Sequence, residues 1–248
     1  MKLDCILKKP IAHRGLHDET NPENSMAAFR AAIAFGFPIE MDVRLSKDGK
    51  VVVFHDDNLH RMTGANLLVK DCSYEDLSVL RLEGSQERNP LFSDFLKEVD
   101  GKVPLLIEIK KMPSVNTNDF LNLVIDELKG YKGEYAMQSF QPFYMKAFKK
   151  LCPDIPVGIL SSADFTKQHF NGSIFWRIKA RALKNMSFNK SIKPEFISYH
   201  FTDYPSKPTD KFLGAKLAWT IRSPEDEAYA RKYADNIIFE GYIPNMPE

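Results

Sequence analysis

Short apolar runs alternate with amphipathic stretches along the whole chain. Several of the runs are nearly continuous in Val, Ile and Leu, as expected of strands that are covered on both faces. The runs are Ile11–Ala12, Pro38–Leu45, Val51–Phe54, Val103–Ile109, Tyr135–Phe140, Ile155–Leu160, Phe196–Tyr199, Lys216–Ile221 and Asn236–Phe239. Between them the pattern predicts helices at Glu23–Phe35, Asp119–Leu128, Pro142–Leu151 and Pro224–Tyr233. Helix-start signals support two of these helices, at Asn21-Pro22-Glu23-Asn24 and at Ser223-Pro224-Glu225.

This alternation predicts parallel strands joined by right-handed crossovers. About eight such units close into a (β/α)₈ (TIM) barrel. A doubly wound open sheet is the alternative, because periodicity alone does not separate the two folds. The stretch 56–102 is long for one loop and contains helical pieces at Tyr74–Leu82 and Leu91–Val99. We therefore expect one catalytic domain over residues 1–248, with a small insertion at about 56–102.

Composition narrows the possible partners. Lys plus Arg is 34 and Asp plus Glu is 33, a formal net charge of +1, which argues against an electrostatic nucleic-acid binder. Three widely spaced cysteines favour a reducing compartment over a disulfide framework. No secretory signal and no apolar run long enough for a membrane span is visible. We expect a soluble, cytoplasmic protein without stable membrane insertion; its oligomeric state stays open.

Acidic residues inside apolar strands are the most informative feature. Glu40 and Asp42 are two apart in Pro38–Val43, and residues at that spacing share one face of a strand. Two carboxylates on a buried face repel each other and lose hydration, which a divalent cation relieves. Glu108 has the same character within Leu105–Lys110. Three carboxylates suit Mg²⁺ or Ca²⁺ better than Zn²⁺. The alternative is that each acid only pairs with Arg44 or Lys110.

Two histidines follow strand-like runs. His13 comes directly after the first run and His55 after Val51–Phe54, so both are expected at strand C-terminal ends, where active sites of α/β barrels form. Histidines at such a place are suited to acid and base roles near neutral pH. Arg14 offers a planar fork for a phosphate oxygen. Each histidine taken alone would more often be structural.

Other polar and aromatic residues carry weaker signals. Lys110 shares a strand face with Glu108, so it either contacts a substrate anion or forms a salt bridge to that acid. The segment 23–25 supplies either helix capping or polar groups near the site. Phe140 and Trp219 fall near strand ends and are candidates to line the substrate site, with barrel packing as the default. Nucleotide-binding glycine loops are absent from the sequence, so no nucleotide cofactor is indicated.

Taken together, these residues resemble the glycerophosphodiester phosphodiesterase family. The resemblance covers roughly the first half of the chain and is carried by an ordered set of motifs. They are Ala12-His13-Arg14-Gly15, Asn21-Pro22-Glu23-Asn24-Ser25, Ile39-Glu40-Met41-Asp42-Val43-Arg44, Lys47-Asp48-Gly49, Val53-Phe54-His55-Asp56 with Arg61 and Thr63-Gly64, and Leu106-Ile107-Glu108-Ile109-Lys110, with weaker matches at Gln138-Ser139-Phe140 and Trp219-Thr220.

The resemblance implies a TIM barrel with a small insertion and a divalent metal, Ca²⁺ or Mg²⁺. By the matching motifs, it implies that Glu40, Asp42 and Glu108 hold the metal. It also implies that His13 and His55 are the acid–base pair and that Arg14 and Lys110 contact the phosphate. The substrate would be a glycerophosphodiester, cut to glycerol 3-phosphate and an alcohol. Where the family often ends its last strand with Thr-Asp-x-Pro, this chain has Phe239-Glu240-Gly241-Tyr242, which bears on substrate preference.

Several alternatives stay open at this point. The nucleophile is either water or the substrate's own glycerol hydroxyl, which would give a cyclic phosphate. One alternative function is a lysophospholipase D-type enzyme acting on intact lysophospholipids, for which residues 170–188 mix aromatic and basic side chains. Another is a non-catalytic phosphoester-binding barrel, which the intact set of candidate residues disfavours.

Overall fold

The computed structural model describes residues 3–163 and 174–245. The chain divides into two compact units, one formed by Ile11–Tyr135 and the other by Met1–Pro10 with Ala136–Glu248. Every candidate metal, acid–base and phosphate residue of the sequence belongs to the first unit. The single-domain organisation with an insertion at about 56–102 stays a prediction.

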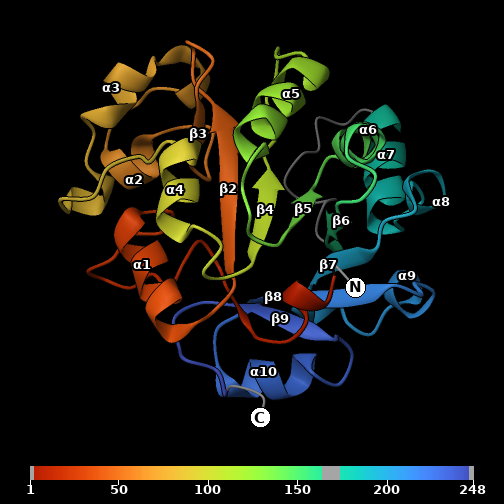
Figure 1. Cartoon of the computed structure of the whole chain (residues 1–248). Coiled ribbons are helices and arrows are strands. Elements are labelled where there is room, and N and C mark those ends of the chain that lie inside the picture. Colours follow the sequence, from red (N-terminus) through yellow and green to blue (C-terminus); the bar gives the residue numbers. More distant parts are fainter. Residues whose placement is uncertain (1–2, 164–173, 246–248) are drawn as a thin grey trace. The chain divides into compact units, whose positions relative to one another are not determined.

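The sheet of the first unit is built around strand β2 (Ile39–Leu45). Strand β1 (Ile11–Ala12) pairs with it in parallel on one side and β4 (Leu105–Ile109) on the other. Figure 1 shows β2 and β4 side by side. The register places Asp42 directly opposite Glu108. Because partners in a parallel register share a face, the acids of the two strands converge on one side of the sheet.

Strand β3 (Val51–Val53) corrects one expectation, because it runs antiparallel to β2 and not parallel. A turn around Gly49 (φ 78°) joins the two strands, and Val43 pairs with Val53. The run Val51–Phe54 is therefore the returning arm of a hairpin and not the strand of a further βα unit. Apolar runs of this length look alike in both settings, which is why the sequence pattern did not separate them.

Between β3 and β4 the chain forms short helices over its own small core. They are α2 (His60–Thr63), η2 (Val69–Asp71), α3 (Tyr74–Ser78), η3 (Leu82–Gly84) and α4 (Phe92–Val99). Leu59, Met62, Val69 and Leu77 are among the buried members of this core. The predicted helical pieces at Tyr74–Leu82 and Leu91–Val99 thus correspond to α3 and α4.

Helix α1 (Met26–Phe35) begins three residues later than predicted. Its N-cap is Ser25, whose side chain accepts a hydrogen bond from Ala28 N at 3.1 Å. The start signal at Asn21-Pro22 was therefore wrong, since Asn24 has a φ of 54° and does not enter the helix. Helix α5 (Thr117–Leu128) begins after its N-cap Asn116 and crosses from β4 toward the end of the unit.

The second unit continues the strand and helix alternation. Strands β6 to β9 pair in parallel with their neighbours, and β5 pairs with β6. The strands are β5 (Tyr135–Ser139), β6 (Val157–Ser161), β7 (Phe196–His200), β8 (Ala215–Ile221) and β9 (Asn236–Phe239). The helices are η1 (Asp4–Ile6), α6 (Pro142–Leu151), α7 (Ile174–Lys184), α8 (Asn189–Ile192), η5 (Phe201–Asp203), α9 (Lys207–Asp210) and α10 (Pro224–Ala230). Ser223 caps α10 as predicted.

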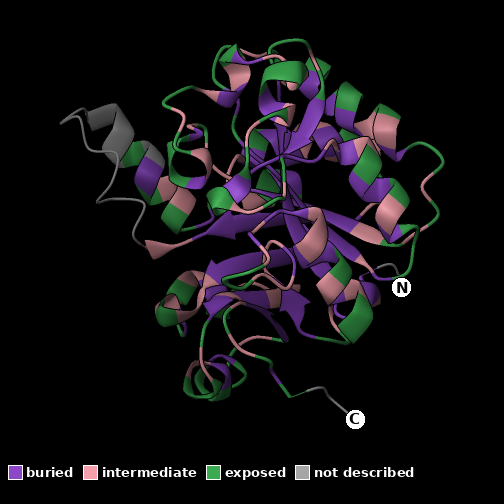
Figure 2. Ribbon diagram, turned by 90° about the vertical axis from the view of Figure 1, so that its left-hand side faces the viewer, coloured by how far each residue is buried: buried purple, intermediate pink, exposed green. Residues whose placement is uncertain are grey.

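Nearly all residues of the strands are buried, and Figure 2 shows buried residues in purple. All residues of β2 and β4 are buried, including their acidic ones. Within the described ranges, no helix has the length and apolar character needed to cross a membrane. Part of the mixed aromatic and basic segment, 170–173, lies outside the described residues.

Candidate active site

Three buried carboxylates meet on one face of the sheet in the first unit. Glu40 and Asp42 come from β2 and Glu108 from β4. One oxygen of each lies within 4.8 Å of the others. The period of two along β2 and the register between β2 and β4 produce this convergence, as the sequence predicted for the first two acids.

Two cationic side chains lie among these acids. Lys110 Nζ is 2.8 Å from Glu108 Oε1 and 3.3 Å from Asp42 Oδ1. Arg14 Nε lies 3.5 Å from Asp42 Oδ2, and the Arg14 backbone N–H donates to Glu40 Oε2 at 3.1 Å. The two residues proposed from the sequence to bind phosphate therefore lie directly beside the acid cluster.

Electrostatics differ sharply between the acids. Burial raises the pKa of Glu40 well above its ordinary value, and the neighbouring Asp42 and Glu108 raise it further. Burial alone would also raise the pKa of Asp42, but Lys110, His55 and Arg14 outweigh it and hold the pKa below its usual range. The ammonium of Lys110 loses hydration, yet Asp42 and Glu108 raise its pKa. The surroundings therefore favour the charged forms of Asp42 and Lys110 and disfavour the charged form of Glu40.

The acid cluster fits a divalent cation on these observations. Three carboxylates face two cationic side chains, and Glu40 is buried with its pKa raised. Asp42 Oδ1 is buried and has no hydrogen bond, although Lys110 Nζ lies 3.3 Å away. Carboxylate oxygens are the ligands that Ca²⁺ and Mg²⁺ prefer. The residues present therefore suit a hard cation.

Backbone geometry after β1 places Arg14 and Gly15. Arg14 has a φ of 56° and Gly15 a φ of 82°. A Cβ on Gly15 would lie 2.9 Å from the backbone carbon of Ala28, so only glycine fits between this turn and α1. Asn24 N donates to Arg14 O at 2.9 Å and closes the turn.

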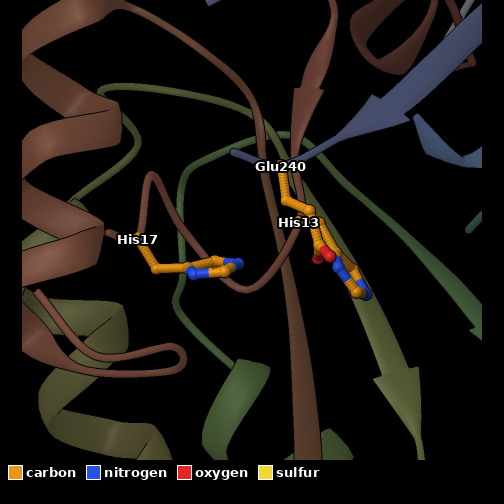
Figure 3. Close-up of side chains that lie close together, drawn as sticks. All are labelled: His13, His17 and Glu240. Atoms are coloured by element: carbon orange, nitrogen blue, oxygen red, sulfur yellow. The ribbon is translucent and has the colours of Figure 1, made fainter. Parts of the chain in front are cut away.

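Histidine 13 lies on this turn, close to the acids. Its Nε2 is 4.0 Å from Glu40 Oε2. Figure 3 shows His13 and His17 on the segment that follows β1. A ring nitrogen of each lies within 4.8 Å of the other. His17 is therefore a neighbour of His13 that was not among the candidates from the sequence.

Histidine 55 reaches the acids for a reason other than the predicted one. Because β3 is the returning arm of the hairpin, the residues after it run back beside the middle of β2, where Phe54 N donates to Asp42 O at 3.1 Å. The buried Arg44 fixes this position, since its Nε and one terminal nitrogen donate to His55 O at 2.9 and 2.6 Å. One alternative from the sequence had been that Arg44 pairs with an acid of the cluster. Its hydrogen bonds go instead to the backbone oxygen of His55.

Side chains that sequence reasoning did not assign complete the site. Asn24 Nδ2 donates to Asp42 Oδ2 at 2.8 Å. His55 Nδ1 is 2.6 Å from Asp56 Oδ1, and Arg61 contacts both Asp56 and Glu23. Among these, His55 had been assigned and the segment 23–25 had been noted as a possible source of polar groups, whereas Asp56 and Arg61 had been named only as members of a matching motif, without a role. The contacts of Asn24 with Asp42 and of Arg61 with Glu23 join residues that are far apart in the sequence, so no local sequence pattern indicates them.

Phe140 and Trp219 lie in the second unit, and their rings meet edge to face with centroids 5.5 Å apart. Their assignment as substrate-lining residues stays a prediction. Glu240 belongs to the segment Phe239–Tyr242, where the sequence departs from the family pattern. Arg222 Nε donates to Glu240 Oε1 at 2.7 Å.

Comparison with known proteins decides the family. The model of the glycerophosphoryl diester phosphodiesterase family matches residues 13–234. The chain belongs to this family. It is 31% identical over 245 residues to the glycerophosphodiester phosphodiesterase of Caldanaerobacter subterraneus subsp. tengcongensis, covering 92% of each protein. It is also 37% identical over 147 residues to the lysophospholipase D GDPD1 of Rattus norvegicus, covering 54% of this chain and 45% of that protein.

Solved structures of the family show the fold. The Oleispira antarctica phosphodiesterase, determined in complex with sn-glycerol 3-phosphate, matches with a TM-score of 0.76 at 22% identity over 93% of this chain and 91% of that one. The enzyme of Thermotoga maritima matches with a TM-score of 0.69 at 24% identity, covering 92% of each chain. These matches confirm the predicted (β/α)₈ barrel fold class and exclude the doubly wound sheet, with β3 as a strand additional to the parallel ones.

Proposed function

We propose that the chain hydrolyses glycerophosphodiesters to sn-glycerol 3-phosphate and an alcohol. The observation that carries the proposal is the gathering of the buried carboxylates Glu40, Asp42 and Glu108 with Arg14 and Lys110 in one unit. A carboxylate cluster with adjacent cationic donors suits a phosphodiester, whose reacting centre is an anion that gains charge in the transition state. Family membership and the product bound to the Oleispira relative support the same substrate class.

A divalent cation, Ca²⁺ or Mg²⁺, completes the proposed site. Glu40, Asp42 and Glu108 would hold it. A cation bound there supplies Lewis-acid polarisation of a nonbridging phosphoryl oxygen. The guanidinium of Arg14 and the ammonium of Lys110 bind the phosphoryl oxygens and stabilise the charge that develops on them.

Two imidazoles would move the protons. His55 faces Asp56, a carboxyl whose pKa burial alone would raise but which the hydrogen bonds from His55 and Arg61 hold below its usual range. An ionised Asp56 only accepts hydrogen bonds, so His55 Nδ1 carries the proton and Nε2 is the atom that exchanges a proton with the substrate. His13 takes the complementary acid or base role. In the net reaction, water adds to phosphorus and the bond from phosphorus to the alcohol oxygen breaks.

A panel of glycerophosphodiesters, coupled to detection of glycerol 3-phosphate, tests this proposal. We expect release from at least glycerophosphocholine or glycerophosphoethanolamine, with kcat reduced roughly 10²–10⁴-fold in His13→Ala and in His55→Ala. Unchanged turnover in both variants would refute the acid–base assignment. No release from any member of the panel by the wild-type protein would refute the substrate class. A ³¹P spectrum of the reaction would show whether a cyclic phosphate forms on the way.

The match to rat lysophospholipase D GDPD1 supports a second candidate, hydrolysis of intact lysophospholipids. An assay of choline release, run with lysophosphatidylcholine and with glycerophosphocholine, separates the two candidates. A kcat/KM for lysophosphatidylcholine above that for glycerophosphocholine would favour the lysophospholipase D activity; the reverse ratio would favour the glycerophosphodiester.

A further inference from the structure

Arg61 bridges two carboxylates beside the proposed active site. Its two terminal nitrogens donate to Glu23 Oε2 at 3.0 Å and to Glu23 Oε1 at 2.6 Å. Its Nε donates to Asp56 Oδ2 at 2.7 Å. All three nitrogens of the guanidinium are therefore engaged, and the two acids are fixed in a single plane of donors.

Each of these two acids also holds a residue of the proposed reaction. Glu23 Oε1 accepts a hydrogen bond from an Arg14 terminal nitrogen at 2.8 Å. Asp56 Oδ1 lies 2.6 Å from His55 Nδ1. A continuous chain of charged contacts thus runs from Arg14 through Glu23, Arg61 and Asp56 to His55.

The backbone that carries Arg61 is anchored on both sides. Arg61 belongs to α2, and its neighbours Leu59 and Met62 are buried in the core between β3 and β4. Thr63 Oγ1 donates to Leu59 O at 2.9 Å and ties the short helix to its start. The side chain of Arg61 is 45% exposed, so solvent reaches it although its position is fixed.

We propose that Arg61 is a positioning residue, which orients Arg14 through Glu23 and His55 through Asp56. This inference rests on the proposed phosphodiesterase function. Arg61 touches neither acid–base histidine directly, and it gives the segment between β3 and β4 a role in the reaction. Without it, the carboxylates of Glu23 and Asp56 lose the partner that fixes their angle, and Arg14 and His55 lose their orientation.

The size of the effect separates positioning from stability. Solvent-exposed ion pairs contribute little to folding, so removal of the half-exposed Arg61 should cost little stability. A misplacement of catalytic groups by about 1 Å lowers turnover by up to roughly 10²-fold. A lysine at this position keeps the charge but cannot donate to both acids in one plane.

The test compares Arg61→Ala and Arg61→Lys with the wild-type protein, using glycerophosphocholine as substrate. A matched control is Arg30→Ala, because Arg30 is a similarly exposed arginine. Its ion pair with Glu98, 2.9 Å long, does not belong to the proposed active site. We expect kcat to fall roughly 10–100-fold in both Arg61 variants, by more than KM rises. The melting temperatures should stay close to that of Arg30→Ala. Millimolar guanidinium should restore part of the turnover of Arg61→Ala, since the site of the lost side chain is open to solvent.

A double-mutant cycle completes the test. Because Arg61 acts through Asp56 on His55, the losses in Arg61→Ala and Asp56→Asn should be strongly non-additive. Turnover in the Arg61 variants equal to that of Arg30→Ala would overturn the inference while leaving the proposed function intact. So would a loss that only follows unfolding and that guanidinium does not restore. Absence of wild-type turnover on every glycerophosphodiester would instead remove the proposed function on which the inference depends.

Discussion

Replacement of Lys110 by methionine tests the electrostatics of the acid cluster. Lys110 is only 8% exposed, and its ammonium lies 2.8 Å from Glu108 and 3.3 Å from Asp42. Removing one partner of a buried ion pair leaves its counter-charges uncompensated, at a cost of about 3–5 kcal/mol. For a chain of this length that loss lowers the melting temperature by roughly 6–20 °C in the presence of a chelator.

A divalent cation should narrow this difference in stability. A ligand at 100 times its Kd stabilises the folded state by about 2.7 kcal/mol, and the Lys110→Met site offers it an excess of carboxylate charge. The assay is thermal unfolding of the wild type, Lys110→Met and the control Lys97→Met, each with chelator and with Ca²⁺ or Mg²⁺. Lys97 is 77% exposed and pairs with Asp94, so its loss should have little effect. If Lys110→Met and Lys97→Met had the same melting temperature in the presence of chelator, Lys110 would not compensate the charge of Asp42 and Glu108 as described.

Three further predictions concern Glu127, Asn24 and the requirement for a cation. Burial raises the pKa of Glu127 to about 7, with Asp94 adding to it, so the folded state keeps this proton at a pH where the unfolded chain has lost it. Stability is therefore lost as the pH rises from 4.5 to 7. In urea titrations, the free energy of unfolding of Glu127→Gln should exceed that of the wild type by about 1–2 kcal/mol at pH 8 and equal it at pH 4. The same difference at both pH values would count against this prediction. Asn24→Ala removes the hydrogen bond to Asp42 and should cost about 1.5–3 kcal/mol in the same titration and lower cation affinity roughly 10–100-fold; unchanged affinity would separate Asn24 from the site. Chelation should abolish release of glycerol 3-phosphate and Ca²⁺ or Mg²⁺ should restore it, whereas turnover indifferent to chelator would exclude a required cation.

The acid cluster was predictable because a strand has a fixed period. Two residues two apart on an apolar strand must share a face, so Glu40 and Asp42 were certain to lie together once the strand formed. Glu108 was grouped with them only because it occupies a similar place in an apolar strand, and the pairing of β2 with β4 became visible only in the structure, where β3 is the returning arm of a hairpin.

Other features depend on contacts that the local pattern does not contain. The direction of β3 is set by the turn at Gly49 and by the core that follows it, and the residues of Val51–Phe54 are the same for either direction. His55 was expected at the site for this wrong reason, and it lies there because a hairpin brings it back. The helix start shifted to Ser25 because Asn24 is drawn toward Asp42 by a buried hydrogen bond between residues far apart in sequence.

The network around Arg61 shows a third kind of limit. Arg61 belongs to a motif that matches the family, but its residue type and place in the sequence gave it no role, and only the folded chain reveals its three donors to Glu23 and Asp56. The roles of Arg14 and His55 were assigned from their residue types and their place after strands. The side chains that orient them have no such signature.

Calorimetric titration of the metal-free protein with Ca²⁺ and with Mg²⁺ tests the central claim most directly. The three buried acids predict one cation per chain for the wild type, and an affinity greatly reduced in Glu40→Gln and in Asp42→Asn. Wild-type heats equal to those of dilution, or variants that bind as tightly as the wild type, would contradict the claim that Glu40, Asp42 and Glu108 form a cation site.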